Sequence, residues 1–132
     1  MSKILIAFLL ILSTGCGASA IERNVVGLSV SAGVLDVGLI AMTEACREDT
    51  LMVKPERIST CVRMLAVHDI SRALWETWRA SVVAAAADER ALDLVKAIIP
   101  QLIQAYEEFA DGLRSFGIDA PSMPDLILEI LS

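Results

Sequence analysis

The sequence predicts an all-α protein: an antiparallel helical hairpin or bundle of three long helices, followed by a short C-terminal helix. No stretch alternates apolar and polar residues for long enough to form a strand, whereas apolar residues recur at helical spacings through most of the chain. A chain of 132 residues that is 55% hydrophobic can bury one core. We therefore expect a single helical-bundle domain over residues 21–132.

Residues 1–20 have the profile of a signal peptide. Lys3 precedes nine consecutive apolar residues at 4–12, a run too short to span a bilayer by itself. Two processing sites follow this run: a lipobox-like Thr-Gly-Cys ending at Cys16, and an Ala-Ser-Ala cleavage site ending at Ala20. We expect lipidation of Cys16, with cleavage after Ala20 or an uncleaved anchor as the alternatives. In each case the rest of the chain is exported to the periplasmic face of a bacterial envelope, and lipidation predicts anchoring in the outer membrane.

The first helix is predicted from about Asn24 to Asp49. Its segment from Val25 to Met42 contains 18 residues and one charge, that of Asp36. A helix that is apolar nearly all round lies centrally in a bundle or inserts in a membrane. Because an unpaired buried carboxylate is costly, we expect Asp36 at an exposed edge, in a pair with an arginine of the second helix, or on a helix-association surface.

The two cysteines after the leader lie 15 residues apart, on either side of a polar stretch that contains Pro55. Proline cannot continue a preceding helix but fits the first turn of a new one. A turn near residue 53 places Cys46 and Cys61 level with each other on the two arms of a helical hairpin. In an oxidising periplasm this predicts a disulfide, with two buried free cysteines as the alternative.

The second helix is predicted from Pro55 to about Ala87, with a break at Asp88-Glu89. Its buried face is expected to begin with Ile58, Val62 and Leu65. The third helix carries apolar residues at alternating spacings of three and four, which is a heptad seam. This seam is expected to pack along long partner helices, either those of the same chain or those of another subunit. The seam residues are Leu92, Val95, Ile99, Leu102, Tyr106, Phe109, Leu113 and Phe116.

Two special residues shape the third helix, and a short helix follows it. Pro100 is expected to kink the third helix, and Gly117 to cap its end. A turn at Pro121–Asp125 then starts a final helix at 126–131, which is too apolar to extend freely into solvent. We expect that helix to fold back as a lid over the bundle, with a partner-docking peptide as the alternative.

Charge and motifs narrow the possible functions. The net charge is −6, and loss of Lys3 with the leader leaves ten basic and 17 acidic residues, a net charge of −7. Scattered basic residues on an acidic chain exclude nucleic acid as a partner, so we expect membrane attachment through the N-terminal lipid alone. No nucleophile, metal-ligand or phosphate-binding motif is present, and the single histidine, His68, is expected at a helix surface or interface. The sequence therefore predicts neither enzymatic activity nor a metal site, and calls for no cofactor.

The layout of several segments resembles that of known proteins. The lipobox-like leader, the helical hairpin, and the segments 73–78, 99–102 and 117–124 together resemble small helical lipoproteins encoded in bacteriophage and prophage genomes. This resemblance implies a location and an origin, but no activity. In size and helical content the chain is also similar to secretin pilotins, lipoproteins that grip a partner's helix in a groove.

These observations together predict a non-enzymatic helical lipoprotein that acts by contact with an envelope protein or by self-association through the seam. A phage-encoded protein of this kind would serve in superinfection exclusion or as an accessory in envelope lysis. The first alternative is a small membrane-active lysis protein, holin-like or spanin-like, that inserts residues 25–42. The second is a pilotin-like protein that binds a partner's helix.

Overall fold

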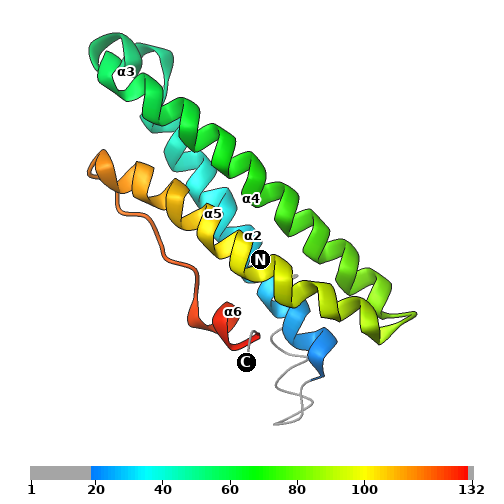
Figure 1. The fold of residues 1–132 in the computed structure, drawn as a ribbon. Helices are drawn as coiled ribbons and strands as arrows, with labels where there is room; N and C mark the ends of the chain where they lie inside the picture. The colour runs from blue at the N-terminus through cyan, green and yellow to red at the C-terminus, as the bar shows by residue number, and fades with distance from the viewer. Residues whose placement is uncertain (1–18, 131–132) are drawn as a thin grey trace.

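The computed structural model describes residues 19–130 and folds them as three long helices packed along one another (Figure 1). Residues 1–18 of the predicted leader, including Cys16, lie outside the described residues, whereas its last two residues are described. No strand occurs in residues 19–130, so the predicted all-α class is confirmed. The long helices are α2 (Ala20–Ala45), α4 (Ile58–Ala85) and α5 (Val95–Ser115). The short ones are α3 (Glu48–Val53), α6 (Asp125–Ile130) and the 3₁₀ segments η2 (Pro55–Arg57) and η3 (Glu89–Leu94).

Helix α2 begins and ends earlier than the predicted range of about 24–49. It begins early because the Ser19 hydroxyl accepts the Glu22 N–H at 3.1 Å while the Glu22 carboxylate accepts the Ser19 N–H at 3.2 Å. This reciprocal pair is a capping box. The helix ends at Ala45 because Arg47 adopts an extended backbone, with φ −61° and ψ 148°. Its guanidinium bridges the break with ion pairs to residues on either side of it, and α3 follows as a separate helix.

The predicted break between the second and third helices is confirmed, but the predicted third helix begins as a 3₁₀ segment. Asp88 Oδ1 accepts the Arg90 N–H at 3.1 Å and so caps η3, after which α5 begins at Val95. The hydrogen bonds from Arg90 also lower the pKa of the Asp88 carboxyl. Residues 86–94, which include η3, therefore connect the end of α4 to the start of α5 at one end of the bundle.

Helix α5 contains Pro100 in its interior and ends at Ser115 in the predicted glycine cap. Gly117 has φ +78°, and its N–H donates to the Arg114 carbonyl at 2.9 Å. The Ile118 N–H donates to the Leu113 carbonyl at 3.1 Å. These two bonds form a Schellman motif, in which only glycine adopts the left-handed backbone without strain.

The chain after α5 returns along the bundle, so that α6 lies against α2 (Figure 1). Ile127 of α6 is fully buried, which agrees with the expected covering helix. On the way, the Tyr106 hydroxyl donates to the Pro121 carbonyl, and burial raises the pKa of this phenol. The C-terminal segment therefore completes the core.

Two glycines of α2 occupy opposite environments. A Cβ built on Gly38 would lie 2.7 Å from Cε1 of Phe109, a fully buried ring in α5. A Cβ built on Gly33 would meet no atom within 4 Å. Gly38 thus permits the close approach of α2 and α5, whereas Gly33 has no such role.

The same substitution is therefore expected to have opposite effects at these two positions. Gly33→Ala should raise the free energy of unfolding by up to about 1 kcal/mol, because alanine is the better helix former. Gly38→Ala should lower it by roughly 1–2 kcal/mol, since overpacking against a rigid ring exceeds that gain. Urea unfolding followed by circular dichroism measures both changes. Destabilisation by Gly33→Ala, or stabilisation by Gly38→Ala, would contradict the packing described.

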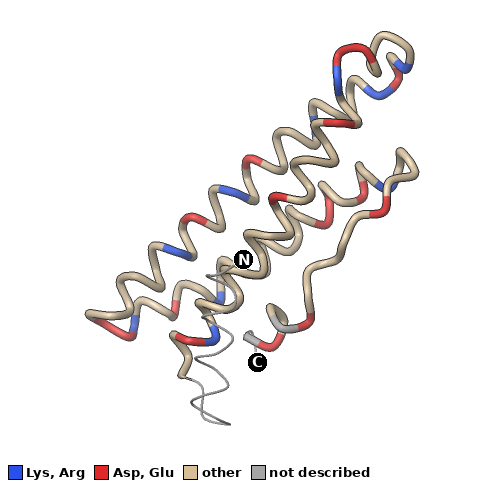
Figure 2. Tube along the Cα trace, turned by 180° about the vertical axis from the view of Figure 1, so that it is seen from behind, with Lys and Arg blue, Asp and Glu red and all other residues tan. Residues whose placement is uncertain are grey.

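Charges are distributed unequally over the long helices. Figure 2 shows basic and acidic residues interspersed along α4. In α2, by contrast, the long stretch between Arg23 and Glu44 contains one charged residue, Asp36. In residues 19–130, α2 is the helix long and apolar enough to cross a membrane by length and composition. About 39% of its most apolar window is buried in the bundle. One side of α2 therefore packs in the core, and the other side is an exposed apolar surface.

Candidate functional site

The heptad seam of α5 is the centre of the core. Six of its eight residues are at most 2% exposed, and the other two, Leu92 and Phe116, are partly buried against the same cluster. The seam packs against helices of its own chain, as the hairpin alternative predicted. The seam is therefore not available to a partner or to a second subunit, because α2 and α4 pack against it.

Asp36 lies apart from this seam, on the exposed side of α2. It lines a shallow cavity of about 330 Å³ between α2 and α4, together with His68, Arg72, Trp75 and Glu76. Within residues 19–130, Asp36 forms no ion pair, so the predicted pairing with an arginine is not seen and the exposed-edge alternative applies.

His68 is at a helix interface rather than at the surface. It is 4% exposed, its Nε2 lies 3.1 Å from the Leu35 carbonyl of α2, and its ring centroid lies 5.0 Å from that of Phe109. His68 of α4 therefore connects the three long helices, through its bond to Leu35 of α2 and its ring contact with Phe109 of α5.

Both tryptophans of α4 donate to α2. Trp78 Nε1 donates to Asn24 Oδ1 at 2.7 Å, and Trp75 Nε1 donates to the Leu28 carbonyl at 3.0 Å. Asn24 is buried, and its amide nitrogen donates to the Ala20 carbonyl at 2.8 Å. These bonds give an apolar interface a defined register, because an unpaired buried donor would be costly.

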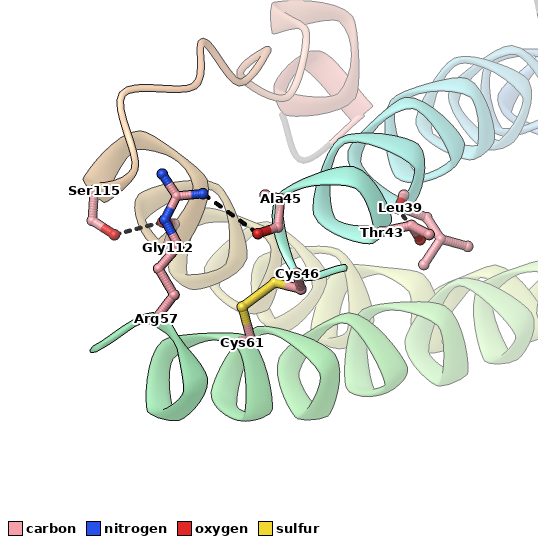
Figure 3. The surroundings of a disulfide bond; sticks show 8 residues. All are labelled: Leu39, Thr43, Ala45, Cys46, Arg57, Cys61, Gly112 and Ser115. Atoms are coloured by element: carbon pink, nitrogen blue, oxygen red, sulfur yellow. Dashed lines mark hydrogen bonds between the residues drawn. A yellow bond between two sulfur atoms is a disulfide. The ribbon is translucent and has the colours of Figure 1, made fainter. Parts of the chain in front are cut away.

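The far end of the α2–α4 interface is closed by the predicted Cys46–Cys61 disulfide (Figure 3). The two Cα atoms are 6.0 Å apart. Beside the disulfide, Arg57 Nη1 donates to the Ala45 carbonyl at 3.4 Å, and the guanidinium lies 4.4 Å from the centroid of the Phe116 ring. Covalent, hydrogen-bonded and cation–π contacts therefore join α2, α4 and α5 at this end. Such a bond forms in oxidising compartments and indicates an exported protein.

The hairpin end of the bundle, on either side of Cys61 in the sequence, exposes a group of large apolar side chains. We call these residues of α3 and the first turns of α4 the apolar tip: Met52, Val53, Ile58, Val62 and Leu65. Met52 and Val53 are 79% and 78% exposed. On α4, the spacing of 58, 62 and 65 places three of the five on one helix face. Sequence reasoning missed this group because it assigned Ile58, Val62 and Leu65 to the buried face of the second helix.

Near the tip, Arg47 forms two local ion pairs. Arg47 contacts Asp49 and Glu44 at 2.9 and 3.0 Å, and the hydrogen bond from Arg47 lowers the pKa of the exposed Asp49 carboxyl. Exposed pairs of this kind contribute little to stability. Other charged residues of this end lie among the apolar ones in the sequence and are exposed, namely Lys54, Glu56 and Arg63.

The described residues contain no group of three or more metal-ligating side chains. Comparison with protein families, with curated proteins and with solved structures found no match to this chain. Any functional proposal therefore depends on the geometry of this bundle.

Proposed function

We propose that this protein is an exported helical lipoprotein that presents its apolar tip to a protein of the bacterial envelope and acts by contact rather than catalysis. The observation that carries the proposal is the position of the apolar tip. Helix α2 has 26 residues and so extends about 39 Å. Its first residue, Ala20, lies at one end of the bundle and α3 at the other (Figure 1). A chain attached to the membrane through Cys16 would therefore present the tip away from the bilayer.

The capping box of α2 supports processing at Cys16. Cleavage after Ala20 would remove Ser19, whose hydroxyl and N–H both bond to Glu22. A chain that begins at Cys16 retains this cap, which is worth about 1 kcal/mol. Of the two cleaved forms, the lipidated one is thus the form in which α2 is complete.

The partner proposed for the tip is an envelope protein with an apolar surface, because large apolar side chains exposed at one end of a bundle favour a protein contact. Superinfection exclusion, by contact with an envelope protein that an incoming phage uses, is the biological role we propose for a phage-encoded chain. Within the described residues, the disulfide adjoins the tip and holds it in one shape for such a contact.

Site-specific photo-crosslinking in living cells tests this proposal. A photoreactive residue at Val62 is expected to crosslink to one envelope protein, and Val62→Asp should abolish both that contact and any exclusion of superinfecting phage, measured as plating efficiency. Val83 is the matched control, because it is equally exposed, at 66% against 65%, at the other end of the same helix. Equal crosslinking at both positions, or crosslinking to a second copy alone, would contradict the proposal.

A second candidate function has an observation of its own. Helix α2 is long and apolar enough to insert in a membrane, and Val37 and Ile40 on its outer side are 56% and 71% exposed. In this proposal residues 25–42 leave the bundle and act in lysis. If a Cys16→Ser variant is soluble after export, insertion is excluded. If it stays in the membrane after alkaline extraction although residues 1–20 have been cleaved off, insertion replaces the contact proposal.

A further inference from the structure

The end of the bundle opposite the apolar tip contains a second feature, a cavity of about 470 Å³. It lies where the first turn of α2 meets η3 and the first turn of α5. We call it the anchor-end cavity. Its volume falls within the ~300–1,000 Å³ of small-molecule sites. The residues around it are Ala20, Arg23, Asn24, Glu89, Arg90, Leu92, Asp93, Val95 and Lys96.

The floor of the anchor-end cavity is rigid and half apolar. Asn24 is 5% exposed, and both ends of its amide are engaged, by Trp78 and by the Ala20 carbonyl. Val95 is 2% exposed and Leu92 is partly buried in the core. A ligand in this cavity therefore meets an apolar wall and finds its charged partners at the rim.

The rim carries charges of both signs. Arg90 is engaged by Asp88, with Nη2 and Oδ2 3.1 Å apart. The remaining two cations, Arg23 and Lys96, and the two carboxylates, Glu89 and Asp93, form no ion pair with any residue in 19–130. Two cations and two anions around one opening match a ligand that carries a phosphate and an ammonium group.

The location of the cavity indicates the source of such a ligand. Ala20 lines the cavity and is four residues from Cys16. Four residues span at most about 14 Å. If Cys16 is acylated, as in the function proposed above, the cavity must therefore lie close to the headgroups of the bilayer.

We propose that the anchor-end cavity binds the headgroup of a phospholipid that carries a phosphate and a primary ammonium, as phosphoethanolamine does. Arg23 and Lys96 bind the phosphate oxygens, and Glu89 and Asp93 accept hydrogen bonds from the ammonium. Leu92 and Val95 lie against the glycerol carbons. The headgroup holds the bundle in a fixed orientation on the membrane, which directs the apolar tip away from it.

Calorimetric titration of the full-length protein in detergent tests this binding with glycerophosphoethanolamine as the probe. Arg23→Gln with Lys96→Gln is expected to weaken binding by about tenfold. Arg63→Gln with Arg72→Gln removes the same charge from exposed positions on α4 and should leave binding unchanged. Equal loss in both double variants, or no loss in either, would overturn the proposal. Circular dichroism of each variant shows that the fold is retained.

Two further probes separate the lipid headgroup from other anions. Glycerophosphocholine has no ammonium hydrogens and should bind more weakly, and this difference should disappear in Glu89→Ala with Asp93→Ala, which removes the acceptor oxygens. Inorganic phosphate that binds as tightly as the headgroup probe would assign the cavity to a free anion and overturn the proposal. Since the probe is soluble, its binding does not require acylation. The mass of the purified protein tests acylation at Cys16 separately.

Discussion

Reduction of the Cys46–Cys61 disulfide is expected to lower the free energy of unfolding by about 3 kcal/mol. The bond closes a loop over a sequence separation of 15 residues, and a cross-link of this length restricts the unfolded chain. A loss of this size is a large fraction of the stability of a domain of about 110 residues. Urea unfolding followed by tryptophan fluorescence, with and without reductant, measures it.

The control for this experiment is the double variant Cys46→Ala with Cys61→Ala. It should unfold at the lower urea concentration and should show no further response to reductant. Alkylation gives an independent check, because unreduced protein labelled under denaturing conditions should leave Cys46 and Cys61 unmodified. A reductant-insensitive midpoint in the wild type, or alkylation of both residues, would contradict the disulfide.

The reduced protein should loosen unevenly. At the disulfide end, the hydrogen bond from Arg57 to the Ala45 carbonyl is long, at 3.4 Å. At the other end, the shorter bond between Trp78 and Asn24 is unaffected. Hydrogen exchange should therefore accelerate at the end of α2 near Ala45 more than near Asn24. This difference matters for the proposed function, because the apolar tip depends on the end that loosens.

The parts of the fold that could be predicted from the sequence are those set by local patterns. The seam of α5, the break at Asp88 and the cap at Gly117 each depend on residues within one or two turns of each other. The disulfide was also predictable, because Pro55 fixes the turn and places Cys46 and Cys61 at equal depth.

The remaining features depend on tertiary packing. Trp75 and Trp78 meet α2 at residues 47 and 54 positions away, and no periodicity in the sequence indicates which carbonyl or amide accepts them. Ile58, Val62 and Leu65 of the apolar tip have the spacing of a buried face, but α2 and α5 pack on the other side of α4, so these three residues stay exposed. The predicted start near Asn24 differs from the observed start at Ala20 because residues 1–20 fit a signal-peptide profile, although Ser19 and Glu22 have capping-box spacing.

Replacement of Phe109 by alanine is expected to destabilise the protein more than any other change considered, by about 3–5 kcal/mol. The ring is fully buried where the three long helices meet. It packs against Gly38 of α2, against the His68 ring of α4, and 6.2 Å, centroid to centroid, from the Tyr106 ring. Phe116→Ala, the same change at a partly buried site in the turn after α5, should cost less than half as much. Phe109→Leu should lie between the two.

A double-mutant cycle distinguishes this contact from a general loss of core volume. Gly38→Ala is destabilising in the wild type because its methyl group would lie 2.7 Å from the Phe109 ring. In a Phe109→Ala or Phe109→Leu background that clash is reduced or absent, so the helix propensity of alanine should dominate. Gly38→Ala should then become neutral, or stabilising by up to about 1 kcal/mol. Additive effects of the two substitutions would mean that α2 does not approach α5 at Gly38. The half-buried position of α2 would then be wrong. The choice between the contact proposal and membrane insertion depends on that position.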